Sequence, residues 1–407
     1  MADQPTLKRG LGLPLLVLYG LGTTVGAGIF VLVGEIAGIA GPAAPLSFLI
    51  ASVLAGLTAL SFGEMATRFP VSAGEAAYVQ AGLGSRHLAT LVGFLVIAAG
   101  TVSSAAIVNG FVGYFEAFVE MPDWSAILLI TLVLATLAIW GIVESVIVAA
   151  VVTLIEVGGL ILVVIVAGDN FVHLPRLWDE FHDLDQAALI MPVLTASALA
   201  FYAFIGFEDM VNLSEEVRNV ENVMKNAIIT TLAVTAVLYV SVSTISILTV
   251  PASLLGESRA PLALIYETAT GSDPYIISAI GVIAVINGAL IQMIMAARVV
   301  YGLASRGMLP ASLGLISART LTPVRATMLV AAMVLTLAIL LPIVPLAQLT
   351  SLATLTVFAL VNLSLYVLLG SKAAPSTRKT LPRWVPALGF LASGAFALFQ
   401  IYVLVAG

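Results

Sequence analysis

The chain has 407 residues, of which 61% are hydrophobic and only 9% are charged, and its mean hydropathy is +1.14. Soluble domains carry roughly 25% charged residues, so this composition excludes a water-soluble globule and favours a protein embedded in lipid. The net charge of −6 leaves no basic surface for nucleic acid. Because the chain has no cysteine and only three histidines, all in polar stretches, we expect neither a metal centre nor a cofactor.

Apolar stretches of membrane-spanning length recur along the chain after the polar residues 1–10. They cover 11–39, 45–67, 88–118, 124–141, 146–168, 189–212, 226–250, 274–304, 324–341, 346–370 and 384–405. Each can supply the ~20 residues that cross ~30 Å of hydrocarbon, and none alternates as barrel strands do. The sequence therefore predicts an all-α integral membrane protein with about 11 transmembrane helices.

The basic residues predict the orientation of these helices. With residues 1–10 as a cytoplasmic tail, 14 of the 16 Lys and Arg side chains fall on the cytoplasmic side, and only Arg176 and Arg259 fall outside. This is a strong positive-inside bias. The segment 169–188 is then an acidic extracellular loop. We expect a multi-pass protein of the cell membrane whose function lies within its helical bundle.

The first span contains an unusual run of glycines. Gly20, Gly22, Gly26 and Gly28 lie within nine residues at mid-span, where glycine weakens a helix. A break there would expose amide N–H groups at the start of the following half-helix, which favours an anion such as a carboxylate. The alternative is close helix packing, since Gly22 and Gly26 form a GxxxG pair.

The sixth span contains a second unusual run, from Phe201 to Asp209. It places Gly206, Glu208 and Asp209 at membrane depth, where acids are costly and usually functional. These acids would suit a break or a watery cavity, and we interpret them as a gate or polar network. The alternative places them at the cytoplasmic end, hydrogen-bonded to neighbouring loops.

The spacing of the two breaks predicts an internal repeat. Gly26 and Gly206 are 180 residues apart and lie in the first and sixth spans. Each of these two spans is the first of a set of five, and the sets cover 11–168 and 189–370. Residues 371–407, with the last span, lie outside this pattern. Because five is odd, the second set has inverted topology, and matching broken helices point to a transporter's central site.

Four motifs in order resemble those of a known transporter superfamily. They are GTTVGAGIFVLVGEIAG (22–38), FGEMATRFPVSAGEAAYV (62–79), FYAFIGFEDMVNLSEEVRNV (201–220) and AARVVYGLASRGMLP (296–310). Together they resemble the amino acid–polyamine–organocation superfamily, especially bacterial relatives of the cationic amino acid transporter group. The resemblance implies a leucine-transporter-type fold of five plus five inverted helices, with helices 1 and 6 broken. The chain departs from it at Asn219-Val220, where Asn-Pro is usual, and in having 11 spans where 12 are common.

The resemblance also implies a substrate site between the two breaks. The substrate's ammonium would meet carbonyls freed around Phe201, Tyr202 and Phe204, next to Gly206, with Tyr202 and Phe204 as aromatic gates. Ordinary aromatic packing is the alternative. The substrate's carboxylate would bind backbone amides close to the hydroxyls of Thr23 and Thr24, and these amides belong to Thr24, Val25, Gly26, Ala27 and Gly28.

The same resemblance implies roles for further polar residues, at the wall of the substrate site and in proton coupling. Ser103 and Ser104 would line the wall of the site, although serines in helices often bond back to their own helix. Glu156 lies in an apolar stretch, where a proton-coupled relative has a lysine, and its carboxyl group would carry the coupling proton. A structural glutamate is the alternative. Sodium is disfavoured, since residues 279–304 contain no Ser or Thr for the eighth-helix ion site.

These observations favour a secondary transporter that moves an amino acid or related amine by alternating access with a proton. An uncoupled exchanger and a non-transporting amino acid sensor are the alternatives. A channel is disfavoured because no span offers a filter or a charged ring. An enzyme is disfavoured because the short loops hold no nucleophile–base set. The expected partners are a small-molecule substrate and the lipid bilayer.

Overall fold

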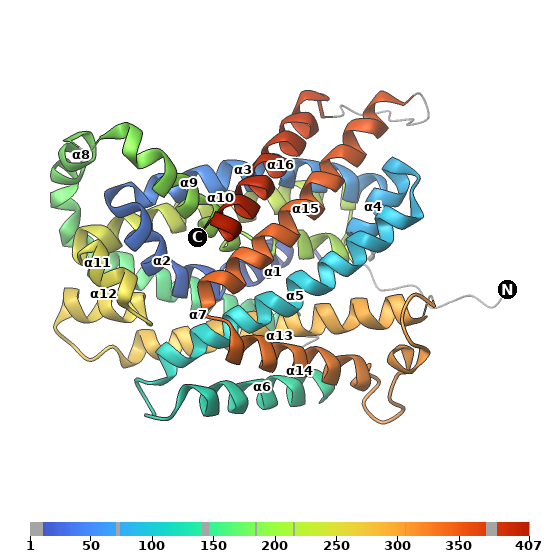
Figure 1. The fold of residues 1–407 in the computed structure, drawn as a ribbon, viewed down its shortest axis with the longest axis horizontal. Helices are drawn as coiled ribbons and strands as arrows, with labels where there is room; N and C mark the ends of the chain where they lie inside the picture. Colours follow the sequence, from blue (N-terminus) through green and yellow to red (C-terminus); the bar gives the residue numbers. More distant parts are fainter. Residues whose placement is uncertain are drawn as a thin grey trace.

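The computed structural model describes residues 11–70, 74–140, 146–183, 185–214, 216–305, 307–371 and 381–406. Within these ranges every regular element is a helix (Figure 1). The first half comprises α1 (Leu13–Thr24), α2 (Ala27–Ala40), η1 (Gly41–Ala43), α3 (Ala44–Arg68), α4 (Gly74–Leu83), α5 (Arg86–Phe115), α6 (Asp123–Trp140) and α7 (Val146–Val166). A link of η3 (Gly168–His173) and α8 (Leu174–Asp183) follows.

The second half begins with α9 (Gln186–Tyr202) and η4 (Phe207–Leu213). It continues with α10 (Val220–Thr249), α11 (Ala252–Glu257), α12 (Pro261–Thr270), α13 (Tyr275–Ser305), η5 (Ala311–Gly314), α14 (Val324–Leu340) and α15 (Ile343–Gly370), and α16 (Trp384–Ala406) comes last. The range 169–188, predicted as a loop, therefore contains helical turns.

The described helices confirm an all-α membrane protein. Eight are long and apolar enough to cross a bilayer when α2 to α3 count as one stretch, and a ninth is added if α7 and its bent continuation count as one span. Every predicted range holds a helix, but α1 and α14 have only 12 and 17 residues. The count of 11 spans stays a prediction.

Helices of the first half pack against helices of the second half. Such pairs are α2 with α9, α3 with α10, α5 with α13, and α6 with α14, and α15 also packs on α5. Figure 1 shows α6 and α14 side by side along one edge of the bundle. The two interrupted helices lie at the centre, where Ile29, Phe30 and Phe201 are fully buried.

The four tryptophans of the chain mark the borders of the apolar surface. Trp124 and Trp140 stand near the two ends of α6, Trp384 begins α16, and Trp178 lies on α8. All four are exposed. Such a placement at helix ends is typical of the aromatic belts at membrane–water interfaces.

The two ends of the bundle carry different charged residues and different contacts. We call the end at which α3 finishes, with Arg68, the basic end. There the backbone of Leu11 accepts a hydrogen bond from the Arg218 amide at 2.9 Å, which ties the start of α1 to the chain beyond η4. At the opposite end, named here the Arg259 end, Arg259 bridges Glu116 at 2.7 Å and Asp123 at 2.8 Å.

Candidate functional site

The first interruption lies within the glycine-rich run. α1 ends at Thr24, Val25 and Gly26 are not helical, and α2 begins at Ala27. The first N–H groups of α2 have no acceptors within their own helix, and the helix dipole makes this end positive. Other glycines of the run serve packing: a Cβ atom at Gly28 would lie 2.6 Å from the Ala203 Cα atom. The break and the close packing therefore coexist.

The second interruption follows α9. The chain turns at residues 203–206 and continues as η4 from Phe207. Gly206 has a φ of 124°, a conformation that favours glycine, and a Cβ atom there would overlap the carbonyl of Thr23. The Gly206 amide donates to the Glu208 carboxylate at 2.8 Å, so this carboxylate bonds to the break itself.

Two hydroxyl groups join the interruptions directly. Thr23 Oγ1 shares its proton between the carbonyls of Gly20 at 3.0 Å and Gly206 at 2.9 Å. The hydroxyl of Tyr239, from α10, bonds to the carbonyl of Thr24 at 2.8 Å and to that of Ala203 at 2.9 Å. The carbonyl ends of α1 and α9 therefore converge on the hydroxyl of Tyr239.

Tyr239 was not predicted from the sequence. Its one signal is a polar-tipped aromatic side chain in the middle of an apolar span, and many such tyrosines simply pack. Only the contact with both carbonyl ends reveals its place at the site.

A small cavity lies between the interruptions, with a volume of about 20 Å³. That is room for about one water molecule, so an amino acid requires the surrounding helices to separate. Thr24 Oγ1 is buried and has no hydrogen-bond partner among the described residues. The cavity is lined by Thr23, Thr24, Gly26, Gly28, Ser103, Ile107, Tyr202, Ala203, Ile205, Gly288, Ile291 and Gln292.

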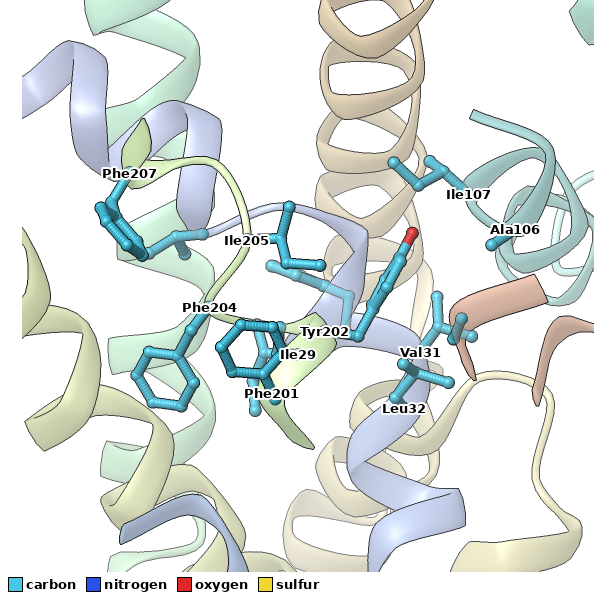
Figure 2. Packing of buried hydrophobic residues seen from close by; sticks show 14 of the residues in the cluster. Ile29, Val31, Leu32, Ala106, Ile107, Phe201, Tyr202, Phe204, Ile205 and Phe207 are labelled. Carbon is cyan, nitrogen blue, oxygen red and sulfur yellow. The ribbon is translucent and has the colours of Figure 1, made fainter. Parts of the chain in front are cut away.

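Of the predicted wall residues, Ser103 and Tyr202 line this cavity together. Their hydroxyl oxygens are 3.0 Å apart, and Figure 2 shows Tyr202 reaching toward Ile107. Ser104 instead donates to the carbonyl of Ala289 in α13 at 3.1 Å. Both serines therefore bond across helices and not back to their own.

Phe201 and Phe204 lie away from the cavity. Phe201 packs edge-to-face on Phe358 with ring centroids 5.7 Å apart, and Phe204 packs on Tyr239 at 5.1 Å. In Figure 2 the ring of Phe204 points to the opposite side from Tyr202. In this conformation the two phenylalanines, like the fully buried Val25, contribute core packing and backbone atoms.

Glu156 is fully buried in α7. Its Oε1 accepts a hydrogen bond from the Asn287 amide of α13 at 3.0 Å, while its Oε2 has no partner in the described part of the chain. One turn earlier on α7, Thr153 contacts Gly22 of the broken first helix. Glu156 therefore lies beside the site but does not line its cavity.

A second cavity of about 40 Å³ lies next to the first and shares Ile205 and Gln292 with it. Asp209 Oδ2 is buried there without a partner among the described residues. Burial raises the pKa of the Glu75 carboxyl on α4 to about 7. The lining comprises Glu75, Val96, Ala99, Gly100, Ile205, Glu208, Asp209, Gln292, Met295, Thr350, Thr354, Val357 and Phe358, among which acids are the only ionisable residues.

Residues 16–407 match the amino acid permease family. The chain belongs to this family. The match confirms the superfamily expected from the four motifs, and it identifies a permease and not an enzyme.

Individual relatives differ in the substrates that their names state. The chain is 29% identical to the branched-chain amino acid permease BcaP of Bacillus subtilis, over 80% of this chain and 73% of that one. It is 30% identical to the vacuolar cationic amino acid transporter 4 of Arabidopsis thaliana, over 80% of this chain but only 57% of the relative. It is 28% identical to a methylthioribose transporter of B. subtilis, over 81% and 74%.

Proposed function

We propose that this permease is a secondary active transporter that moves an amino acid or related amine across the cell membrane by alternating access, coupled to a proton. The observation that carries the proposal is the convergence of both interrupted helices on one small cavity. Amide groups at the start of α2 suit a carboxylate. The carbonyls of Thr24 and Ala203 each keep a second lone pair beside the bond from Tyr239, and these suit an ammonium group. A zwitterion is thus bound without a fixed ion pair.

The pairing of helices supports alternating access by two inverted repeats, 11–168 and 189–370. Four of the contacts between the halves, those of α2 with α9, α3 with α10, α5 with α13 and α6 with α14, join elements that correspond under a five-plus-five arrangement. The tight closure of the breaks, by Thr23 and Tyr239, supports an occluded state from which the helices open. We place the basic end and the N-terminus in the cytoplasm, following the distribution of Lys and Arg.

Proton coupling is assigned to Glu156. Full burial, one free carboxylate oxygen and proximity to the broken first helix support a group that gains and loses a proton during the cycle. The bond from Asn287 is equally what a structural glutamate would make. A purely structural Glu156 would suit the second candidate, an uncoupled exchanger.

The test is uptake of labelled compounds into proteoliposomes under an imposed inward proton gradient. The panel contains branched-chain and cationic amino acids and methylthioribose, because the relatives are named for these. Gradient-driven accumulation that Glu156→Gln abolishes, with exchange retained, supports coupling through this carboxyl. A matched Glu257→Gln variant, at a short helix of the Arg259 end, should behave as wild type.

Other outcomes separate the alternatives. Equal exchange by wild type and Glu156→Gln, indifferent to the gradient, would establish the exchanger. Binding of an amino acid without any flux would indicate a sensor and overturn the transporter proposal.

A further inference from the structure

The link between the two halves turns away from the bundle axis. After α7 the chain bends by 58° into η3 and α8. Figure 1 shows α8 at the far corner of the bundle, at the opposite end from α4. Because α7 alone has 21 residues, enough to cross a bilayer, the segment after the bend is not needed to complete the span.

The sequence of α8 places apolar and charged residues on opposite faces. Leu174, Leu177, Trp178 and Phe181 recur at helical spacing, and Arg176, Asp179 and Glu180 occupy the other side. A short helix with this pattern, aromatic on one face and charged on the other, is typical of a segment that lies in a membrane interface.

Part of the apolar face of α8 is left uncovered by the rest of the chain. Trp178 is 64% exposed and Leu174 is 45% exposed, and Val172 in the preceding turn is 73% exposed. Leu177 and Phe181 on the same face are half-buried, and Phe181 packs against the core. Three large apolar side chains so exposed on one short segment would be costly in water.

The neighbouring surface identifies what covers this face. Ile165 near the end of α7 and Ile190 near the start of α9 are also exposed, and both belong to apolar helices whose outer surface faces lipid. In the chain α8 joins these two helices, and it lies at the end of the bundle at which α6 begins, with the exposed Trp124 in its first turn. This position between two lipid-facing spans favours acyl chains and head groups over a protein partner.

We propose that α8 lies in the membrane–water interface at the Arg259 end, with Leu174 and Trp178 at the boundary of head groups and acyl chains and with Asp179 and Glu180 in water. The acidic face would be repelled by an anionic surface, so the lipid partner is zwitterionic. The proposal is independent of transport, since it concerns only how the link between the halves is anchored.

The depth of Trp178 in a bilayer tests this directly. A variant carrying Trp124→Phe, Trp140→Phe and Trp384→Phe keeps Trp178 as its single tryptophan. It is reconstituted in phosphatidylcholine vesicles that carry bromine at a shallow or a deep position of the acyl chain. We expect strong quenching of Trp178 by the shallow bromine, weaker quenching by the deep bromine, and little quenching by iodide in the aqueous phase.

The matched control moves the probe to the other face of the same helix. In the same background, Trp178→Phe with Asp179→Trp should be quenched by iodide and little by bromolipid. If Trp178 responds to iodide as this control does, α8 lies in water and the proposal is overturned. If neither quencher reaches Trp178, protein covers the face, and the proposal is equally overturned. Should the triple variant fail to reconstitute, the difference in quenching between wild type and Trp178→Phe supplies the same comparison.

Discussion

The side-chain amide of Asn287 donates a 3.0 Å hydrogen bond to Glu156 and so joins α13 to α7 beside the broken first helix. The carboxylate has its other oxygen free of partners among the described residues. A buried carboxyl with one partner is held in place, yet it keeps an acceptor for a proton. The contribution of this hydrogen bond to the stability of the protein can be measured separately from transport.

Replacing Asn287 by Leu should lower the thermal stability of the purified protein in detergent. Without the Asn287 amide the buried Glu156 carboxyl has no hydrogen-bond donor, which lowers the free energy of unfolding by roughly 1–3 kcal/mol. The double replacement Asn287→Leu with Glu156→Leu should recover much of this, because both polar partners are then gone. Thermal unfolding of the two single variants and the double variant measures the coupling. Strictly additive losses would contradict a direct interaction.

Tyr239→Phe should weaken both folding and substrate affinity. It removes the hydroxyl that holds the carbonyl ends of α1 and α9 together, so we expect a lower melting temperature and a several-fold higher KM for uptake. Tyr114→Phe is the matched control, since Tyr114 also bonds to a carbonyl, that of Phe30 in α2, but not at an interruption. It should lower the melting temperature and leave KM unchanged. Equal effects of both variants on KM would remove the special role of Tyr239.

Gly206→Ala should abolish uptake and reduce the yield of folded protein. The added Cβ atom would overlap the carbonyl of Thr23, and the φ of 124° is strained for alanine. Gly26→Ala offers the contrast in the other interruption, where the nearest atom to the new Cβ is the Gly288 Cα at 3.9 Å. We expect near wild-type folding for Gly26→Ala by size-exclusion chromatography. Normal uptake by Gly206→Ala would show that the two breaks do not approach as closely as described.

Glu75→Gln should change how stability depends on pH. Burial raises the pKa of Glu75 from 4.5 to about 7, so the folded protein holds this proton more tightly than the unfolded chain does. The resulting stabilisation is fully present below about pH 4.5 and is lost as the pH rises through about 7, a difference of up to about 3 kcal/mol. The melting temperature of Glu75→Gln relative to wild type should therefore increase from about pH 5 to about pH 8. A constant offset between Glu75→Gln and wild type across this pH range would contradict the prediction.

The sequence predicted the helices and both interruptions because these depend on local chemistry. A run of about 20 apolar residues must satisfy its own backbone hydrogen bonds in lipid, so each predicted range contains helix. The clustered glycines from Gly20 to Gly28 and the run from Phe201 to Asp209 are unfavourable for a continuous helix, and α1 and α9 end within them. Ordered motifs then indicated the family.

The partners of each side chain were decided by tertiary packing alone. Tyr202 lines the cavity whereas Phe204, two residues away, packs on Tyr239, because the turn after α9 sends the two side chains to opposite sides. The contacts of Tyr239 with Thr24, and of Asn287 with Glu156, join residues more than 100 positions apart in the chain. Hydropathy and spacing describe one helix at a time, and such pairs exist only once the helices of both halves have been brought together.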